Sequence, residues 1–285
     1  MTVSANEGSS FRFGRRDALP GFSPTLGLTL FYLALLVLLP LSALVVSASG
    51  MRWHQALAYL ATPRVISAFR VSFGISLAAA LINGVAGLLV AWALVRYEFP
   101  GRRILDGIVD LPFALPTAVA GISLATLYGD TGWIGGLFAP FGIEIAYTRL
   151  GIFVALLFVG LPYVIRTVQP VLAELEVEAQ EAALTLGATS RQIFRRVLWP
   201  PLVPALLTGI AMAFARGVGE YGSMIFIAGN RPGLSEIVPL LIVVKLEEFD
   251  YAGASVLAVA MLFASALILL AINLLQSWER RRHGG

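Results

Sequence analysis

The chain contains long runs of residues without a charged side chain, and this feature restricts its fold more than any other. No charge occurs between Asp17 and Arg52, and none between Arg70 and Arg96. A bilayer core about 30 Å thick is crossed by about 20 apolar residues in a helix. The sequence therefore predicts six spans, at about 26–46, 71–95, 111–129, 150 through 166, 203–228 and 251–278. Pro112 and Pro116 should break the third of these near its start.

The composition agrees with a membrane protein, since 58% of the residues are hydrophobic and 13% are charged, against about a quarter charged in a soluble domain. We predict an all-α integral membrane protein with six transmembrane helices. Its predicted parts are a cytoplasmic tail at 1–22, a transmembrane domain at 23–278 and a cytoplasmic tail at 279–285. The apolar run 237–244 is too short to span, and we expect a loop that dips toward the membrane or packs on its outer face.

The first apolar segment has arginines upstream and small residues at its end, as a signal peptide does. A signal peptide has an apolar core of about 7–15 residues, and this run is longer. We expect a retained first helix, with a cleaved signal as the lesser alternative.

The arginines predict the orientation of the spans, because short loops rich in Lys and Arg stay in the cytoplasm. With the N-terminus inside, the inner segments hold twelve arginines, namely 12, 15, 16, 96, 102, 103, 191, 195, 196, 280, 281 and 282. The outer loops hold Arg52, Arg64, Arg149, Arg231 and Lys245, with Arg70 at an outer helix end. We expect both termini in the cytoplasm.

Several classes of function are excluded by what the sequence lacks. It has no Cys and only two isolated histidines, so thiolate chemistry and an imidazole metal cluster are not expected. Its one lysine, Lys245, lies between Val244 and Leu246, whereas a P-loop requires Gly-Lys followed by Ser or Thr. We expect no cofactor, no covalent catalysis and no nucleic-acid partner.

The longest inner loop, 172–199, has a pattern typical of two short helices. Glu174, Glu176, Glu178 and Glu181 would lie in the early turns of the first, and Gly187 is the expected left-handed stop. Thr189 and Gln192 form a capping box for the second. The prolines 200, 201 and 204 mark the return to the membrane.

The order of residues in this loop resembles the "EAA" loop of ABC-importer permeases. The matching residues are Glu181-Ala182-Ala183, Gly187 and Val197-Leu198-Trp199-Pro200, although the family usually has Ile at 197 and Leu at 199. The resemblance implies the type I ABC-importer permease (MetI-like) fold. It also implies that Glu181 contacts an ATPase subunit, that Ala182 and Ala183 permit close approach, and that Gly187 makes the bend.

Other segments resemble the T-type permeases of bacterial sulfate/thiosulfate importers. The matching segments are Tyr97–Arg102, Asp110–Gly121, Phe226–Asn230 and Phe249–Tyr251, and molybdate permeases share part of this pattern. The resemblance implies sulfate uptake across the bacterial inner membrane by alternating access, with membrane lipid around the chain. It implies as partners two copies of an ATPase subunit, a second related permease and a periplasmic sulfate-binding protein.

Two charges lie inside the fifth predicted span, where charges are usually functional or paired. Arg216 could pass a dianion, or it could pair with Glu220 one helix turn later. We favour a structural or gating pair, because an adjacent carboxylate would repel the anion. Gly217, Gly219 and Gly222 match a dinucleotide fingerprint, but no strand precedes them, so they indicate a flexible point or a close helix contact.

Two other classes of function remain as alternatives. A secondary anion transporter or channel would need coupling-ion residues, and the predicted spans offer only Arg216, Glu220 and Arg166. A membrane-embedded enzyme would need a nucleophile motif or an acid pair, which the sequence does not show. An oxyanion other than sulfate, such as molybdate, stays open as the cargo.

Overall fold

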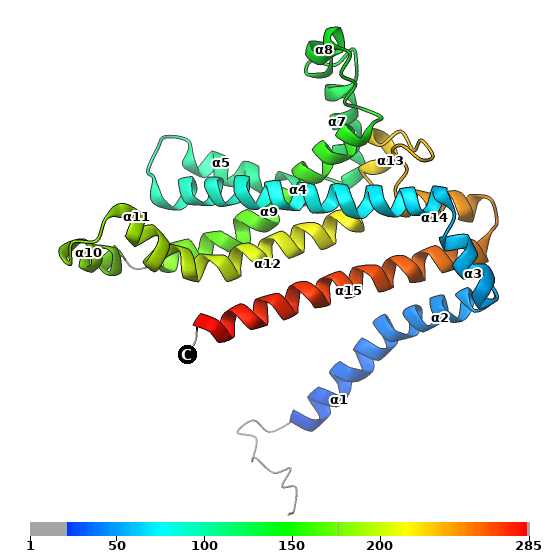
Figure 1. Ribbon diagram of the computed structural model, residues 1–285, viewed down its shortest axis with the longest axis horizontal. Helices are drawn as coiled ribbons and strands as arrows, with labels where there is room; N and C mark the ends of the chain where they lie inside the picture. The colour runs from blue at the N-terminus through cyan, green and yellow to red at the C-terminus, as the bar shows by residue number, and fades with distance from the viewer. Residues whose placement is uncertain (1–21, 176, 284–285) are drawn as a thin grey trace, which may run out of the picture. The chain divides into compact units, whose positions relative to one another are not determined.

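The computed structural model describes residues 22–175 and 177–283, and every regular element in them is helical (Figure 1). The chain divides into two compact units, of which the first ends at Val46 and the second begins at Ser47. A helix pairs its backbone polar groups within itself, as a segment surrounded by lipid must. The predicted tail of residues 1–22 lies outside the described residues, except for Phe22.

The first predicted span is one continuous helix. It is made of α1 (Phe22–Leu33), a π-helical turn η1 (Ala34–Leu38) and α2 (Leu39–Ala48). Pro40 has no N–H to donate to the carbonyl four residues earlier. Just before it, the N–H of Leu39 donates to the carbonyl of Ala34, five residues earlier, which is the π-helical spacing. Large apolar side chains are exposed all around the helix, as expected for a helix that faces lipid.

Three long helices of the second unit pack together side by side in Figure 1. They are α4 (Pro63–Arg96), α9 (Arg149–Glu174) and α12 (Trp199–Val218). The second predicted span is therefore confirmed within α4, which begins at Pro63, eight residues earlier than residue 71. The fourth is confirmed within α9, which contains Pro162 and Pro170.

Small residues on α4 bring its backbone close to the other two helices. A side chain added at Gly87 would collide with Val164 of α9, and one at Gly84 would collide with Ile210 of α12. Asn83, on the same face, donates a 3.4 Å hydrogen bond to the carbonyl of Leu156. Small residues at such spacing are typical of helix contacts within membranes.

The last span is α15 (Tyr251–His283), which packs on α12 and on α14 (Val238–Glu247). α15 includes residues 279–283, which the sequence analysis assigns to a tail. The segment 237–244 is likewise not a loop: α14 is a ten-residue helix that buries Val238, Leu240 and Leu241. Pro239 at its start explains why the helix begins there. The short α3 (Trp53–Leu60) contacts α15 and α4.

The third predicted span, 111–129, is broken near its start. It consists of α6 (Leu111–Ala114) and α7 (Thr117–Tyr128), with Leu115 extended between them. Pro116 disfavours helical backbone at the residue before it. The short elements α5 (Arg102–Val109), α8 (Gly135–Phe138) and η2 (Ala139–Phe141) flank this segment.

The fifth predicted span is too long at its end, because α12 stops at Val218 and a four-residue helix α13 (Met224–Ile227) follows after a turn. Glu220 therefore lies beyond the helix. In the described part of the chain, five helices are long and apolar enough to cross a membrane, and α7 is apolar but shorter.

Candidate functional site

The predicted coupling segment 172–199 connects the end of α9 to the start of α12. α9 extends into it as far as Glu174, so this glutamate ends a membrane helix and does not begin a loop helix. The loop helix α10 runs from Val177 to Thr185. Glu176 lies outside the described residues, and Glu181 is in the middle of α10.

Gly187 ends α10 in the left-handed conformation predicted for it, with φ of 79°. Its N–H donates to the carbonyl of Leu184 at 2.9 Å, and the N–H of Ala188 donates to Ala183 at 3.0 Å. These two bonds make a Schellman motif, which uses carbonyl groups left over at a helix end. No atom lies within 4 Å of a Cβ added at Gly187, so its backbone angle, and not crowding, requires glycine.

The second loop helix starts with the predicted capping box at Thr189 and Gln192. It is not a separate helix, however. α11 (Ser190–Ile193), the π-helical turn η3 (Phe194–Leu198) and α12 form one uninterrupted helix from Ser190 to Val218. Pro200 and Pro201 remove two N–H groups, and just before them the Trp199 N–H donates to Phe194, five residues earlier. The π turn lets the prolines be included without ending the helix.

The exposed side of α10 combines charge with apolar surface. Glu181 and Ala182 are exposed and Ala183 is half-buried. Leu184 and Leu186 are 56% and 88% exposed. These leucines add apolar area next to the charge of Glu181. The sequence analysis missed both leucines.

Aromatic and polar contacts attach the coupling segment to the end of α4. With its oxygen facing Arg96, the Gln180 amide accepts hydrogen bonds of 3.1 and 3.3 Å from that guanidinium. Arg96 lies over the ring of Trp92 at 5.9 Å. The Trp92 ring packs on Phe194 at 6.1 Å, and Phe194 packs on Trp199 at 5.7 Å. Trp199, where the EAA family usually has Leu, thus extends an aromatic contact between α4 and α12.

A second polar link joins the α5–α6 segment to α9. Arg166 donates to both carboxylate oxygens of Asp110 at 2.8 and 2.6 Å and to Asp106 at 2.7 Å. Gln169 donates to Asp106 at 3.0 Å. The hydrogen bond from Gln169 and the Arg166 guanidinium lower the pKa of Asp106. The sequence signal for this contact, which the sequence analysis missed, is a pair of acids four residues apart, Asp106 on α5 and Asp110 just after its end.

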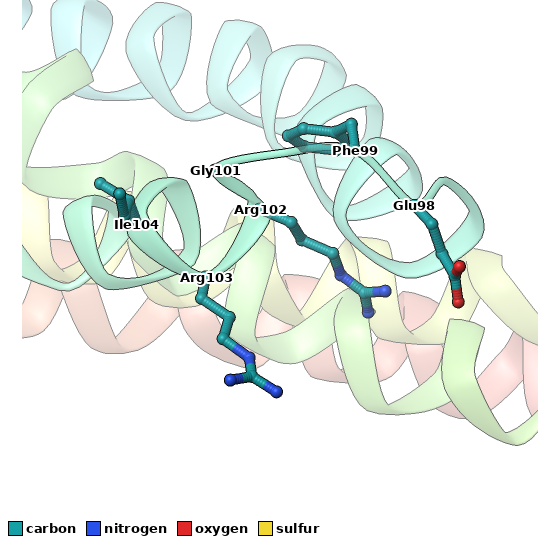
Figure 2. Close-up of a pocket in the computed structure, with 6 residues that line it drawn as sticks. All are labelled: Glu98, Phe99, Gly101, Arg102, Arg103 and Ile104. Carbon is teal, nitrogen blue, oxygen red and sulfur yellow. The ribbon is translucent and has the colours of Figure 1, made fainter.

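Next to this link, the connection from α4 to α5 carries two of the arginines predicted to lie inside. Figure 2 shows Arg102 and Arg103 projecting from the start of α5 on the same side as Glu98. They line a shallow hollow of about 440 Å³ together with Phe99 and Ile104. Gly101, with φ of 87°, makes the turn before the helix.

The two charges predicted inside the fifth span form an ion pair. Arg216, in the last turn of α12, places Nη1 2.5 Å from Oε2 of Glu220. Oε1 of Glu220 accepts hydrogen bonds of 3.0 Å from the N–H and the hydroxyl of Ser223. The Glu220 side chain is 1% exposed and that of Arg216 is 34% exposed. The carboxylate is buried, with Oε1 hydrogen-bonded to Ser223 and Oε2 in the ion pair, whereas part of the guanidinium is accessible.

The turn that carries Glu220 is held closely against α7. A Cβ on Gly222 would collide with Thr117, and a Cβ on Gly121 would collide with the backbone of Ser223. Gly217 packs near Ser76 and Leu156. Of the two interpretations left open for these glycines, a close contact is observed at Gly217 and Gly222, while Gly219 contacts no other element within 4 Å. No group of three or more potential metal ligands occurs among the described residues.

A further ion pair lies near the start of α4. Glu236 is 1% exposed and accepts two hydrogen bonds from Arg64, of 2.8 Å from Nε and 2.6 Å from Nη2. Two residues later, the N–H of Val238 donates to the buried hydroxyl of Ser72 at 2.8 Å. These bonds fix the segment before α14 onto α4. The sequence analysis did not identify Glu236, because an isolated glutamate in a loop gives no signal of burial.

Comparison with protein families gives a match to the binding-protein-dependent transport system inner membrane component over residues 83–283. The chain belongs to this family. The matched region contains the coupling segment, the Arg166 link and the Arg216–Glu220 pair.

Curated relatives extend the similarity over nearly the whole chain. The chain is 54% identical to the sulfate transport system permease protein CysT of Synechocystis sp., over 89% of this chain and 88% of that protein. It is 50% identical to the protein of the same name from Escherichia coli, over 95% of this chain and 98% of the relative. A bacterial alginate ABC transporter, solved with a pentasaccharide-bound periplasmic protein, has a TM-score of 0.71 at 17% identity, over 91% and 93% of the two chains. At that identity the structural likeness shows the fold alone, which is that of an ABC-importer permease.

Proposed function

We propose that this chain is the membrane-spanning permease subunit of an ATP-driven importer that moves sulfate, and thiosulfate with it, into the cytoplasm. The observation that carries the proposal is identity of 50–54% over about nine-tenths of the chain to permeases named for sulfate transport. The arrangement of α10, Gly187 and α11 supports it, because a chain without a P-loop must receive the energy of ATP from another subunit.

The exposed side of α10 is the proposed contact with the ATPase. Glu181 offers a charge at the surface, Ala182 and Ala183 leave room for close approach, and Leu184 and Leu186 supply apolar area. The Schellman motif at Gly187 sets the angle between α10 and α11. The links from α10 to α4 and from α11 to α12 would carry a displacement of this contact to two membrane helices, as alternating access requires.

The remaining partners and the orientation follow from this proposal. Two ATPase copies would dock on two permease chains, and the second chain would be a related permease in a heterodimer. A periplasmic sulfate-binding protein would deliver the anion to the opposite side. The coupling segment then lies in the cytoplasm of a bacterial cell, and both termini of the chain lie on that same side of the inner membrane.

We assign Arg216 and Glu220 a structural or gating role. Glu220 is buried, its Oε1 accepts two hydrogen bonds from Ser223 and its Oε2 contacts Arg216, and Gly222 of its turn packs closely on α7. Such a carboxylate neutralises the arginine that a dianion would need. Charge reversal in Glu220→Lys tests the assignment: we expect loss of stable protein, and normal assembly with faster uptake would contradict it.

The test of the proposed function is uptake of radiolabelled sulfate in cells with and without the gene, with molybdate uptake as the second substrate. We expect loss of sulfate uptake alone. Loss of molybdate uptake alone would keep the permease assignment and overturn the sulfate assignment. No loss of either would contradict an oxyanion importer.

The coupling role needs a variant that disturbs the bend without touching a membrane helix. Gly187→Pro does so, because proline holds φ near −65° and lacks the N–H that Leu184 accepts. We expect this variant to be inserted in normal amount but inactive. Gly107→Ala is the control, since a Cβ there meets no atom within 4 Å. Full activity of Gly187→Pro would contradict the coupling role of this bend.

A further inference from the structure

An arginine-lined hollow lies at the end of α4 and α9 opposite to the coupling segment. Arg70 and Gly74 of α4, Arg149 at the start of α9 and Gly233 of the loop before α14 line this space of about 480 Å³, which we call the Arg70 hollow. Arg149 also lines an adjoining hollow of about 350 Å³, which contains Arg231 and Glu144.

The position of Arg149 is fixed, but its charge is not neutralised. Its Nε donates to the carbonyl of Leu234 at 2.5 Å and its Nη2 to Gly233 at 3.3 Å. The hydroxyl of Ser67 donates to the same Gly233 carbonyl at 3.0 Å and so fixes the loop on α4. Carbonyl groups orient a guanidinium while leaving its unit charge available to an anion.

No carboxylate lines the Arg70 hollow. Within the described residues, neither Arg70 nor Arg149 lies within ion-pair distance of an acidic group, and the nearby Arg64 is already paired with Glu236. The two hollows together contain three arginines and one glutamate. Unpaired charges of one sign in a concave surface concentrate counter-ions there.

We propose that the Arg70 hollow is a binding site for a small tetrahedral oxyanion on the outer side of the transporter. Guanidinium groups bind oxyanions through paired N–H donors, and Arg70 and Arg149 provide two such groups around one hollow. Resting on the proposed function, the site would hold sulfate between its release by the binding protein and its passage through the membrane. Arg216 is paired with Glu220, whereas no carboxylate lines the Arg70 hollow.

The chain has no cysteine, so one introduced thiol can report on this hollow. Gly74→Cys is suitable, because a Cβ at Gly74 meets no atom within 4 Å. The complete transporter is placed in phosphatidylcholine nanodiscs, and the thiol reacts with an anionic sulfonatoethyl or a cationic trimethylammonioethyl methanethiosulfonate. Labelling is read on this chain alone. Thr131→Cys, beside Asp130 in another outer hollow, is the control reporter.

We expect the anionic reagent to label Gly74→Cys about tenfold faster, relative to the cationic one, than it labels a free thiol in solution, because the arginines concentrate anions. Adding Arg70→Gln should remove most of this preference for the anionic reagent. Arg52→Gln removes the same charge from an exposed arginine outside the hollow and should leave the preference unchanged. Sulfate at millimolar concentration should slow labelling, and chloride at matched ionic strength should not. Thr131→Cys should show neither effect.

Two outcomes overturn the proposal. If sulfate and chloride slow the labelling equally, or if neither slows it, the arginines bind no oxyanion specifically. Protection that appears with phosphatidylglycerol in the nanodisc and not with sulfate would assign the hollow to a lipid headgroup. The result is separable from the proposed function. If sulfate slows thiol labelling but the cells show no sulfate uptake that depends on the gene, only the proposed function fails. If uptake depends on the gene but sulfate does not slow labelling, only this site fails.

Discussion

Nη1 of Arg216 lies 2.5 Å from Oε2 of Glu220. The glutamate is nearly fully buried and lies just past the end of α12, the helix that carries the arginine. The pair therefore joins the last turn of α12 to the turn that packs on α7. Its removal should affect how these two elements hold together.

We expect Glu220→Gln and Arg216→Gln each to lower the melting temperature of the purified transporter in detergent. The cost should be about 1–2 kcal/mol, below that of a fully buried pair, because Arg216 is partly accessible. The double variant should lose less than the sum of the two. The control is Glu248→Gln, which removes the exposed pair with Lys245 and should change little. Strict additivity would contradict an energetic link between Arg216 and Glu220.

Glu236→Gln should loosen the segment before α14. The amide group loses one of the two charge-assisted bonds from Arg64 and leaves that cation without its partner. Hydrogen exchange should become faster for the backbone amides of residues 233–238. Glu247→Gln, on the exposed side of α14, is the matched control. Unchanged exchange in Glu236→Gln would show that other contacts hold this segment.

Asp106→Asn should make the protein less stable at neutral pH but not in acid. The folded protein lowers the pKa of Asp106 below its usual value of 3.8 through Gln169 and Arg166, so the charged form is favoured by folding. This stabilisation is fully present above pH 4 and is lost as the pH falls through the lowered pKa. The gap in melting temperature between wild type and Asp106→Asn should therefore narrow below pH 4. A constant gap would contradict the linkage.

Gly187→Ala and Gly187→Asn should differ, although neither side chain meets a neighbour. A left-handed backbone costs alanine about 1–2 kcal/mol, and asparagine tolerates it better. ATP hydrolysis stimulated by binding protein should thus be reduced more by Gly187→Ala than by Gly187→Asn. Equal loss would indicate that the glycine is needed for contact with the ATPase and not for its backbone angle.

Patterns local in the sequence predict local structure well here. Uncharged runs predict the long helices, the capping box at Thr189 is present, and Gly187 has the left-handed backbone that a helix stop before Ala188 needs. Arg216 and Glu220, four residues apart, form the pair that helical spacing suggests.

The features that the sequence does not reveal depend on distant residues. Glu236 is buried because Arg64, 172 residues earlier, lies beside it. Arg166 reaches Asp110 across 56 residues. The same holds for α14, whose short apolar run is stabilised as a helix by packing on α15 and α4. A helix end is also misplaced where a π turn intervenes, between Phe194 and Leu198, whereas the break at Pro116 is local and is predicted.

The uninterrupted helix from Ser190 to Val218 has 29 residues, which corresponds to about 44 Å measured along the helix at 1.5 Å per residue. Its two ends are the capping box near the EAA loop and the arginine of the buried ion pair. Pro200 and Pro201 are included in it through the π turn, so one continuous backbone joins the capping box of the coupling segment to Arg216 of the buried ion pair.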